Sequence, residues 1–199
     1  MQINRRNNNK KQKLTTYGEF LVLFPLCCKE HQEELLATLR KAKRPNFVCG
    51  KEVPPNLNTI TYGQLDDFSR ISQYNEDPAV KVFSILLGIE APHVYELNVF
   101  DVFGILNFIK NELERINGLF ASIQVSHTSE EIAAGIEDLN FGTFGVIDWY
   151  AQRMGITNQD EVYDVAWIRI YTCMKNDNEK AEFEQRLNKQ YMNKAKNKR

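Results

Sequence analysis

The chain has 199 residues, which is enough for one domain with a sizeable hydrophobic core. Its 43% hydrophobic and 26% charged residues are typical of a globular protein, and the absence of any run of about 18 apolar residues excludes a membrane span. The four cysteines lack the spacing of a disulfide framework, and no apolar stretch directly follows the N-terminal arginines. We therefore expect synthesis in a reducing compartment without a secretory signal.

The formal net charge of −1 hides an acidic body with two basic ends. Residues 1–13 and 186–199 carry 11 of the 25 Lys and Arg residues and no acidic residue, whereas residues 14–185 carry 14 basic and 26 acidic ones. Such basic arms bind nucleic acid or acidic protein surfaces, or serve only as solvated tails. Base stacking is not supported, because Tyr191 is their one aromatic residue. We predict an N-terminal arm (1–13), a helical domain (14–185) and a C-terminal arm (186–199).

The first part of the domain gives local signals of different strength. Residues 20–24 form a continuous apolar run that Pro25 stops, which fits either a buried strand or a helical turn. A leucine stripe predicts a helix over residues 29–41. Two short extended pieces around Gly50 predict a small β-hairpin near residues 45–55.

Two clear helix starts follow. Thr61 and Gln64 have the spacing of a capping box, which predicts a helix that begins after Thr61. Asp77 is a good N-cap and Pro78 suits the first helical position, so a second helix is predicted there. We expect this second helix to end at Gly88, which can adopt the left-handed conformation of a helix C-terminus.

The central helix is predicted over residues 99–116, after a short turn at residues 92–97. Apolar side chains cover more than half of its circumference in the first half, which predicts a helix buried on several sides. The dipeptide Asn117-Gly118 predicts a turn that ends it.

Three further helices are predicted in the second half of the chain. A capping box from Thr128 to Glu131 opens a helix that carries apolar residues as far as Leu139. A glycine-containing hinge at residues 141–145 separates it from a helix over 146–154. Thr157 is expected to cap the next turn, and the last helix is predicted over residues 165–191, with a polar second half.

One sequence pattern occurs twice. Gly88-Ile89 is followed by Val94-Tyr95 before the central helix, and Gly155-Ile156 is followed by Val162-Tyr163 before the last helix. The pattern is explained by a duplicated helix pair or by the common reuse of capping signals, and the sequence slightly favours reuse. We predict a mainly α-helical bundle of about six to eight helices with a small β-hairpin near residues 45–55.

The sequence contains one Cys/His cluster, formed by Cys27, Cys28, His31 and Cys49. A zinc site usually has paired ligands on both sides, and the second pair is missing here. We expect small buried cysteines and neither a metal nor a cofactor. No histidine accompanies a nucleophile elbow, and the carboxylates lie on predicted solvated helix faces or first turns. We therefore predict no catalytic residues and a protein that is not an enzyme.

An aromatic group gathers near the predicted glycine hinge and is expected to lie mainly in the core: Phe141, Phe144, Trp149, Tyr150, Trp167 and Tyr171. A second interpretation is an anchor pocket for a protein partner. The candidate partner-binding residues come from this group and from the basic arms, and are Arg5, Arg6, Lys10, Lys11, Phe141, Phe144, Trp149, Trp167, Lys194 and Lys196.

The order of signals over residues 61–116 carries a family resemblance. Thr-x-Gly-Gln-Leu, an Asp-Pro start, an apolar helix that ends in Leu-Leu-Gly-Ile, then Val-Tyr-x-Leu and a long apolar helix resemble the small helical virion-assembly proteins of tailed bacteriophages, most closely tail assembly chaperones. Gly-Ile-Thr-Asn-Gln-Asp-Glu-Val-Tyr-Asp-Val at 155–165 resembles a segment of phage tail and neck proteins. The basic Asn/Lys arms are similar to those of crAss-like phages of gut Bacteroidetes. The resemblance covers about half of the chain.

This resemblance implies a non-enzymatic structural or assembly protein of a tailed-bacteriophage virion, in the tail or neck region. Its partners would be other phage structural proteins or a second copy of the chain, without a membrane or a cofactor, in the virion or in the host cytoplasm during assembly. The basic arms and the aromatic-rich second half depart from a typical chaperone. Two alternatives stay open: an assembly chaperone absent from the mature virion, and a nucleic-acid-binding accessory protein that uses its basic arms.

Overall fold

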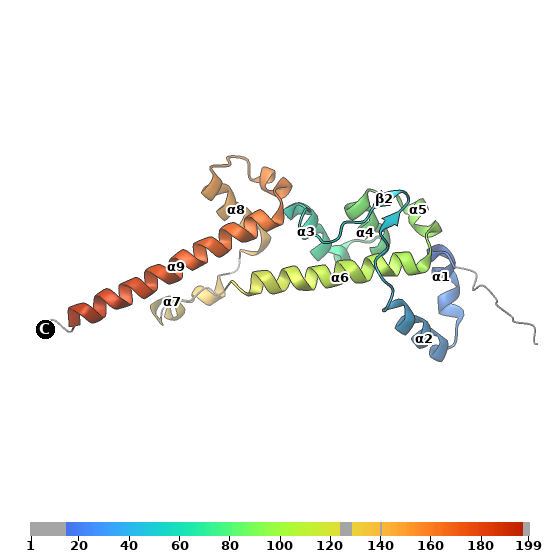
Figure 1. Ribbon diagram of the computed structural model, residues 1–199, viewed down its shortest axis with the longest axis horizontal. Coiled ribbons are helices and arrows are strands. Elements are labelled where there is room, and N and C mark those ends of the chain that lie inside the picture. Colours follow the sequence, from blue (N-terminus) through green and yellow to red (C-terminus); the bar gives the residue numbers. More distant parts are fainter. Residues whose placement is uncertain (1–14, 124–128, 140, 197–199) are drawn as a thin grey trace, which may run out of the picture. The chain divides into compact units, whose positions relative to one another are not determined.

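The computed structural model describes residues 15–123, 129–139 and 141–196, and it confirms a mainly α-helical fold with a small β-hairpin (Figure 1). The chain forms two compact units. Unit 1 comprises Met1–Val53 and Glu76–Ile109, and unit 2 comprises Pro54–Asn75 and Lys110–Arg199. Each unit therefore joins segments that lie far apart in the sequence.

Unit 1 contains helices from two separate parts of the chain and the hairpin. Its elements are α1 (Tyr17–Leu23), η1 (Phe24–Leu26), α2 (Lys29–Leu39), β1 (Phe47–Val48), β2 (Lys51–Glu52), α4 (Pro78–Leu87), α5 (Ala91–Glu96) and the first part of α6 (Val99–Ala121). The predicted helices at residues 29–41 and after Asp77 are confirmed, and α4 ends at Gly88 as expected.

Unit 2 contains the remainder of α6 and the second half of the chain. Its other elements are α3 (Tyr62–Ser69), η2 (Ile71–Gln73), α7 (Ser129–Ala133), η3 (Ile136–Asp138), α8 (Gly142–Met154), η4 (Gln159–Asp164) and α9 (Trp167–Lys196). The capping box predicted at the start of α3 is present, because Thr61 accepts from the Gln64 amide and Gln64 accepts from the Thr61 amide.

The apolar run at residues 20–24 is helical, and only part of it is buried. Thr16 and Glu19 form a capping box that starts α1. Phe20 lies in the core, whereas Val22 and Leu23 are exposed. The interpretation as a buried strand is therefore wrong, because a helix turns successive side chains toward different surroundings.

The central helix extends beyond its predicted end. Asn117-Gly118 lies inside α6, which continues to Ala121. The ring of Phe120 packs 6.1 Å from Trp167 and 5.5 Å from Tyr171, measured between ring centroids. This packing holds the last turn in helical form and overrides the local turn preference of Asn-Gly.

Other boundaries also differ from the sequence prediction. The predicted turn before α6 is the short helix α5. The helix predicted through Leu139 is divided into α7 and η3 by Gly135, which has a φ of 82°. Its predicted cap, Thr128, lies outside the described residues. The 3-10 helix η4 is capped by Asn158, whose side chain accepts from the Asp160 amide, rather than by Thr157.

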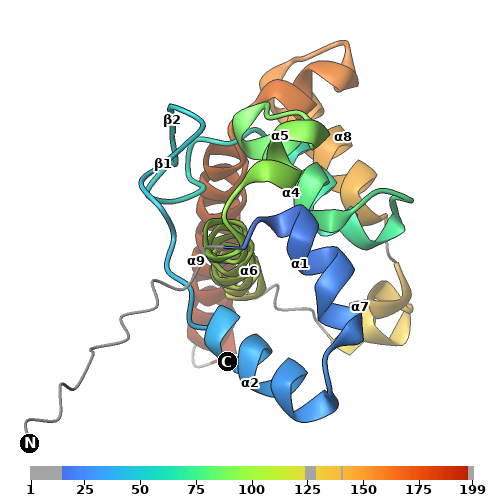
Figure 2. The same ribbon diagram turned by 90° about the vertical axis from the view of Figure 1, so that its right-hand side faces the viewer.

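The predicted hairpin is present (Figure 2), and its Lys51 side chain also caps a helix of the same unit. Cys49 and Gly50 both have positive φ, 50° and 73°, as in the type I′ turns that favour two-residue hairpins. The Lys51 amine donates to the carbonyl oxygens of Leu87 and Gly88 at 2.5 and 3.1 Å. A cation at this position stabilises the C-terminal end of α4.

The two units repeat one local arrangement. In unit 1, Thr16 forms an antiparallel bridge with Asn98, and the Tyr17 amide donates to the Leu97 carbonyl at 2.7 Å. In unit 2, the same pattern of backbone hydrogen bonds joins the start of a Thr-capped helix to the segment that precedes a long helix.

In unit 2, Thr61 forms the bridge with Ala166, and the Tyr62 amide donates to the Val165 carbonyl at 2.8 Å. The helix starts share the sequences Thr-Tyr-Gly-Glu-Phe at 16–20 and Thr-Tyr-Gly-Gln-Leu at 61–65. The repetition thus includes sequence, capping and tertiary pairing.

Both units need a glycine at the same position of this repeated arrangement. A Cβ on Gly18 would lie 3.2 Å from the Tyr95 carbonyl oxygen, and a Cβ on Gly63 would lie 3.1 Å from that of Tyr163. In addition, α4 and α8 both end at a left-handed glycine. Agreement in tertiary contacts as well as in caps favours a duplicated module over independent reuse of capping signals.

Two glycines of α6 provide a test of how closely the chain packs on this helix. A Cβ on Gly104 would overlap the Lys43 carbonyl oxygen and lie 2.9 Å from the carbonyl carbon, whereas a Cβ on Gly118 would meet nothing within 4 Å. We expect Gly104→Ala to lower the free energy of unfolding by about 1–3 kcal/mol through overpacking. Gly118→Ala, the matched control, should raise it by about 1 kcal/mol through helix propensity. Urea unfolding followed by circular dichroism measures both, and equal effects would contradict the close approach.

Candidate protein-docking site

An apolar groove of about 660 Å³ lies beside α8 and α9 in unit 2. We call it the α8–α9 groove. Its apolar lining comes from four elements or connections of the unit and comprises Ile123, Leu139, Phe141, Val146, Trp149, Met174 and Ala181. Pockets of this size and character bind apolar side chains or ligands.

The start of α8, which contributes to this groove, exposes two aromatic rings. Phe141 is the N-cap residue of α8, and its side chain is 70% exposed, while that of Phe144 is 59% exposed. A Cβ on Gly145 would lie 2.6 Å from the Phe141 Cβ, so only glycine lets Phe141 sit against the first turn. The predicted hinge at 141–145 is therefore largely the first turn of a helix.

The charged group that lines the groove is neutralised. Asp177 accepts two hydrogen bonds from the Arg153 guanidinium, at 2.7 and 2.9 Å. The same guanidinium lies 5.9 Å from the ring centroid of half-buried Trp149. The groove therefore presents apolar surface and a paired ion, which suits an apolar anchor better than a charged ligand.

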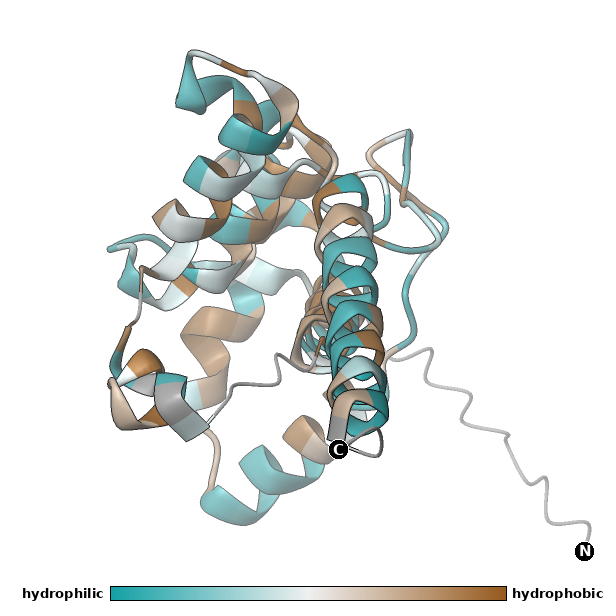
Figure 3. Ribbon diagram, turned by 90° about the vertical axis from the view of Figure 1, so that its left-hand side faces the viewer, coloured by the Kyte–Doolittle hydropathy of each residue, from teal (hydrophilic) through white to brown (hydrophobic). Residues whose placement is uncertain are grey.

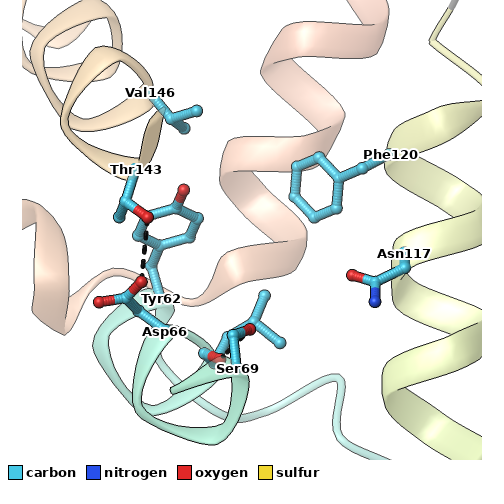
Figure 4. A pocket seen from close by; sticks show the side chains of 8 residues that line it. Tyr62, Asp66, Ser69, Asn117, Phe120, Thr143 and Val146 are labelled. Carbon is cyan, nitrogen blue, oxygen red and sulfur yellow. Dashed lines mark hydrogen bonds between the residues drawn. The ribbon is translucent and has the colours of Figure 1, made fainter. Parts of the chain in front are cut away.

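A smaller pocket of about 190 Å³ lies on another side of Val146, where α3, α6 and α8 meet (Figure 4). The carboxylate in this pocket is already engaged. The Thr143 hydroxyl donates to Asp66 Oδ1 at 3.0 Å, and the Arg70 guanidinium pairs with Oδ2 at 2.7 Å. Both oxygens of this carboxylate thus have partners, which indicates a structural role rather than a general base.

Two buried tyrosines also have structural roles. Burial raises the pKa of Tyr62 to about 12, with a further contribution from the nearby Asp66 carboxylate. Burial likewise raises the pKa of Tyr17, whose hydroxyl donates to the Asp77 carboxylate at 3.0 and 3.1 Å. A phenol with a raised pKa stays protonated at neutral pH and serves as a hydrogen-bond donor or packing group.

The residues predicted to bind partners are placed very differently. Arg5, Arg6, Lys10 and Lys11 lie outside the described residues. Lys194 is exposed near the end of α9, and Lys196 is the last residue of that helix. In the aromatic group, Trp149 lines the groove, whereas Phe141 both lines it and extends into solvent.

Trp167 belongs to the core rather than to a docking surface. Its side chain is 0% exposed, and its indole Nε1 donates to the Leu57 carbonyl at 2.6 Å. Tyr150 is also buried. These two aromatic residues therefore lie in the core, as one interpretation predicted. Only the exposed members of the group can serve as anchors for a partner.

The prediction that the clustered cysteines are buried is wrong. Cys27, Cys28 and Cys49 are exposed, because the first two connect η1 to α2 and the third lies in the hairpin turn. Among the described residues, no group of three or more His, Cys, Asp or Glu side chains is placed to hold a metal ion.

Several surface residues were missed by the sequence analysis. Met174 and Val146 form the groove but carry no signal that separates them from ordinary core positions. Val22, Leu23 and Leu26 are further exposed apolar residues, close together in the sequence of unit 1. Pro25 was the sequence signal that could have identified these exposed residues, since it restricts the apolar run at residues 20–24 to a short helix that cannot bury all of its faces.

Within the described parts of the chain, every helix is too short or too polar to cross a lipid bilayer. Comparisons with protein-family models, with curated proteins and with solved structures found no significant match.

The buried tyrosine Tyr62 predicts a loss of stability in alkali. Because its folded pKa of about 12 exceeds the ordinary value of about 10, ionisation favours the unfolded chain. The contribution of protonated Tyr62 to the free energy of unfolding is intact below pH 10 and is lost as the pH rises through 12. Between pH 9 and pH 11 we expect Tyr62→Phe to reduce the fall in unfolding free energy by about 1 kcal/mol. In the control Tyr191→Phe, which removes an exposed tyrosine, the wild-type fall should persist. Equal pH dependence in all three proteins would contradict the assignment.

Proposed function

We propose that this chain is a non-enzymatic structural or assembly protein of a tailed-bacteriophage virion, in the tail or neck region, that works through protein–protein contacts. The assignment to a phage virion rests on the sequence resemblance over residues 61–116 and 155–165. The docking role rests on the α8–α9 groove.

The α8–α9 groove is the observation that carries the docking role. It combines an apolar lining with the exposed ring of Phe141, and Phe144 in the same helix turn is exposed as well. Exposed apolar surface beside a deep apolar pocket is typical of protein interaction sites, where aromatic residues supply much of the binding energy. A helix that inserts apolar side chains at helical spacing would fit such a groove.

A second apolar surface gives the chain a further contact point. Val22, Leu23 and Leu26 are exposed on α1 and η1 of unit 1. A protein with one apolar surface on each of two units suits the role of a connector between neighbouring subunits. The basic C-terminal end of α9 would add contacts to acidic neighbours.

Polar groups that could have served catalysis are already bound within the fold. Asp66 has partners on both carboxylate oxygens, and Asp77 accepts from the Tyr17 hydroxyl and from the Ala79 amide. These interactions support a role in which the side chains hold shape rather than turn over a substrate.

Mass spectrometry of purified virions tests the proposed place of the protein. A structural subunit should be present at a fixed ratio to the major capsid protein, with several copies per particle. If the protein occurs in infected cells but not in virions, the chaperone alternative replaces the structural one. Absence from both virions and infected cells would contradict a phage function altogether.

A further inference from the structure

The distal half of α9 carries an apolar stripe that is largely exposed in the described part of unit 2. Phe183, Leu187 and Tyr191 are spaced by four residues and therefore share one helix face. Phe183 is 57% and Tyr191 60% exposed, while Leu187 is half-buried. Figure 3 shows α9 as a mostly hydrophilic ribbon with short hydrophobic interruptions. We call these three residues the α9 stripe.

The same helix also lines the groove, through residues that precede the stripe. Met174 lines the groove, and Phe183 follows nine positions later, about two and a half helical turns, so these two side chains lie on opposite sides of the helix. Since α9 is one continuous helix, the stripe lies beyond the groove along the helix axis and cannot fold back onto it. The stripe therefore cannot fill its own groove, and an occupant has to come from another molecule.

The end of α9 and the rest of unit 2 have net charges of opposite sign. Residues 186–199 contain six Lys and Arg and no acidic residue, whereas residues 54–75 and 110–185, which make up the rest of unit 2, contain 16 Asp and Glu against 7 Lys and Arg. Opposite charge around an apolar contact favours the association of one copy with another and orients the approach.

The chemistry of the stripe also suits the groove. Two aromatic rings and a leucine at helical spacing are the usual anchors of a helix that binds in a groove. A groove of about 660 Å³ with an apolar lining and a neutralised aspartate has room for such anchors and offers them no unpaired charge.

We propose that the α9 stripe of one copy docks in the α8–α9 groove of a second copy. Because the stripe and the groove are different surfaces at different positions along one rigid helix, the contact joins unlike patches, and it leaves a free groove on one copy and a free stripe on the other. Such head-to-tail contacts build a ring if the rotation closes and a filament if it does not. The proposal names one partner for the docking surface in the proposed function, and it does not depend on a phage origin.

The test uses two full-length variants that each lose one surface. Phe183→Glu with Tyr191→Glu removes the stripe, and Ala181→Arg places a bulky cation in the groove, where it repels the basic end of an incoming α9. All three positions are exposed, so the fold should persist in both variants. The matched control is Asn188→Glu with Asn193→Glu, which makes the same charge change at exposed positions outside the stripe.

Sedimentation velocity and light scattering over a range of concentrations measure the result. The wild type and the control should form species larger than a dimer, and each surface variant alone should be monomeric or need about 30-fold more protein to associate. A mixture of the two variants should form a one-to-one complex and stop there, since the only intact stripe meets the only intact groove.

Three results would overturn the proposal: a wild type that stays monomeric at every concentration, variants that assemble like the wild type, or a mixture that fails to form the one-to-one complex. A wild type that stops at a twofold dimer would also overturn it. None of these results changes the virion measurement, so failure of self-association is distinguishable from failure of the proposed function.

Discussion

Backbone pairing between a Thr-capped helix start and the segment before a long helix is the constraint on which each unit depends. In unit 1 it joins Thr16 to Asn98, and in unit 2 it joins Thr61 to Ala166. Each pair brings together positions about 80–100 residues apart, so it closes a long loop whose entropy must be offset by packing. Gly18 and Gly63, each two residues after the threonine, allow the backbone of the helix start to approach the segment before the long helix. The tyrosine between threonine and glycine is buried in both units. Without these backbone bridges, the capping boxes would remain, but the capped helices would lose their connection to the segments before the long helices.

The placement of the aromatic residues follows from this pairing. Trp167 comes directly after the bridge residue Ala166, so it enters the core of unit 2 and binds the Leu57 carbonyl. Phe141 and Phe144 belong to the start of α8, and both remain exposed, with Phe141 in the lining of the groove. The same residue type therefore stabilises the fold at one position and offers a binding surface at another. This division supports a docking role for the first turn of α8.

Helix α9 combines a structural half and a surface half. Its first turns bury Trp167 and Ile170, and its middle lines the groove. Beyond residue 181 the side chains are mostly exposed, and the chain changes from acidic to basic character. A helix that continues beyond its own core gains little stability from burial there. A partner that covers the stripe would supply that burial, which is why the distal half is the natural place for a contact between subunits.

The sequence by itself determined what depends on neighbouring residues. The capping box at Thr61, the start of α4 at Asp77 and the helix ends at Gly88 and Gly155 were all predictable, because caps use atoms within a few positions of one another. Only the tertiary structure decided which threonine pairs with which long helix, that α6 continues past Asn117-Gly118, and that Trp167 is buried while Phe141 is exposed. Those outcomes depend on contacts between distant segments, such as Phe120 with Tyr171, and no local pattern in the chain encodes them.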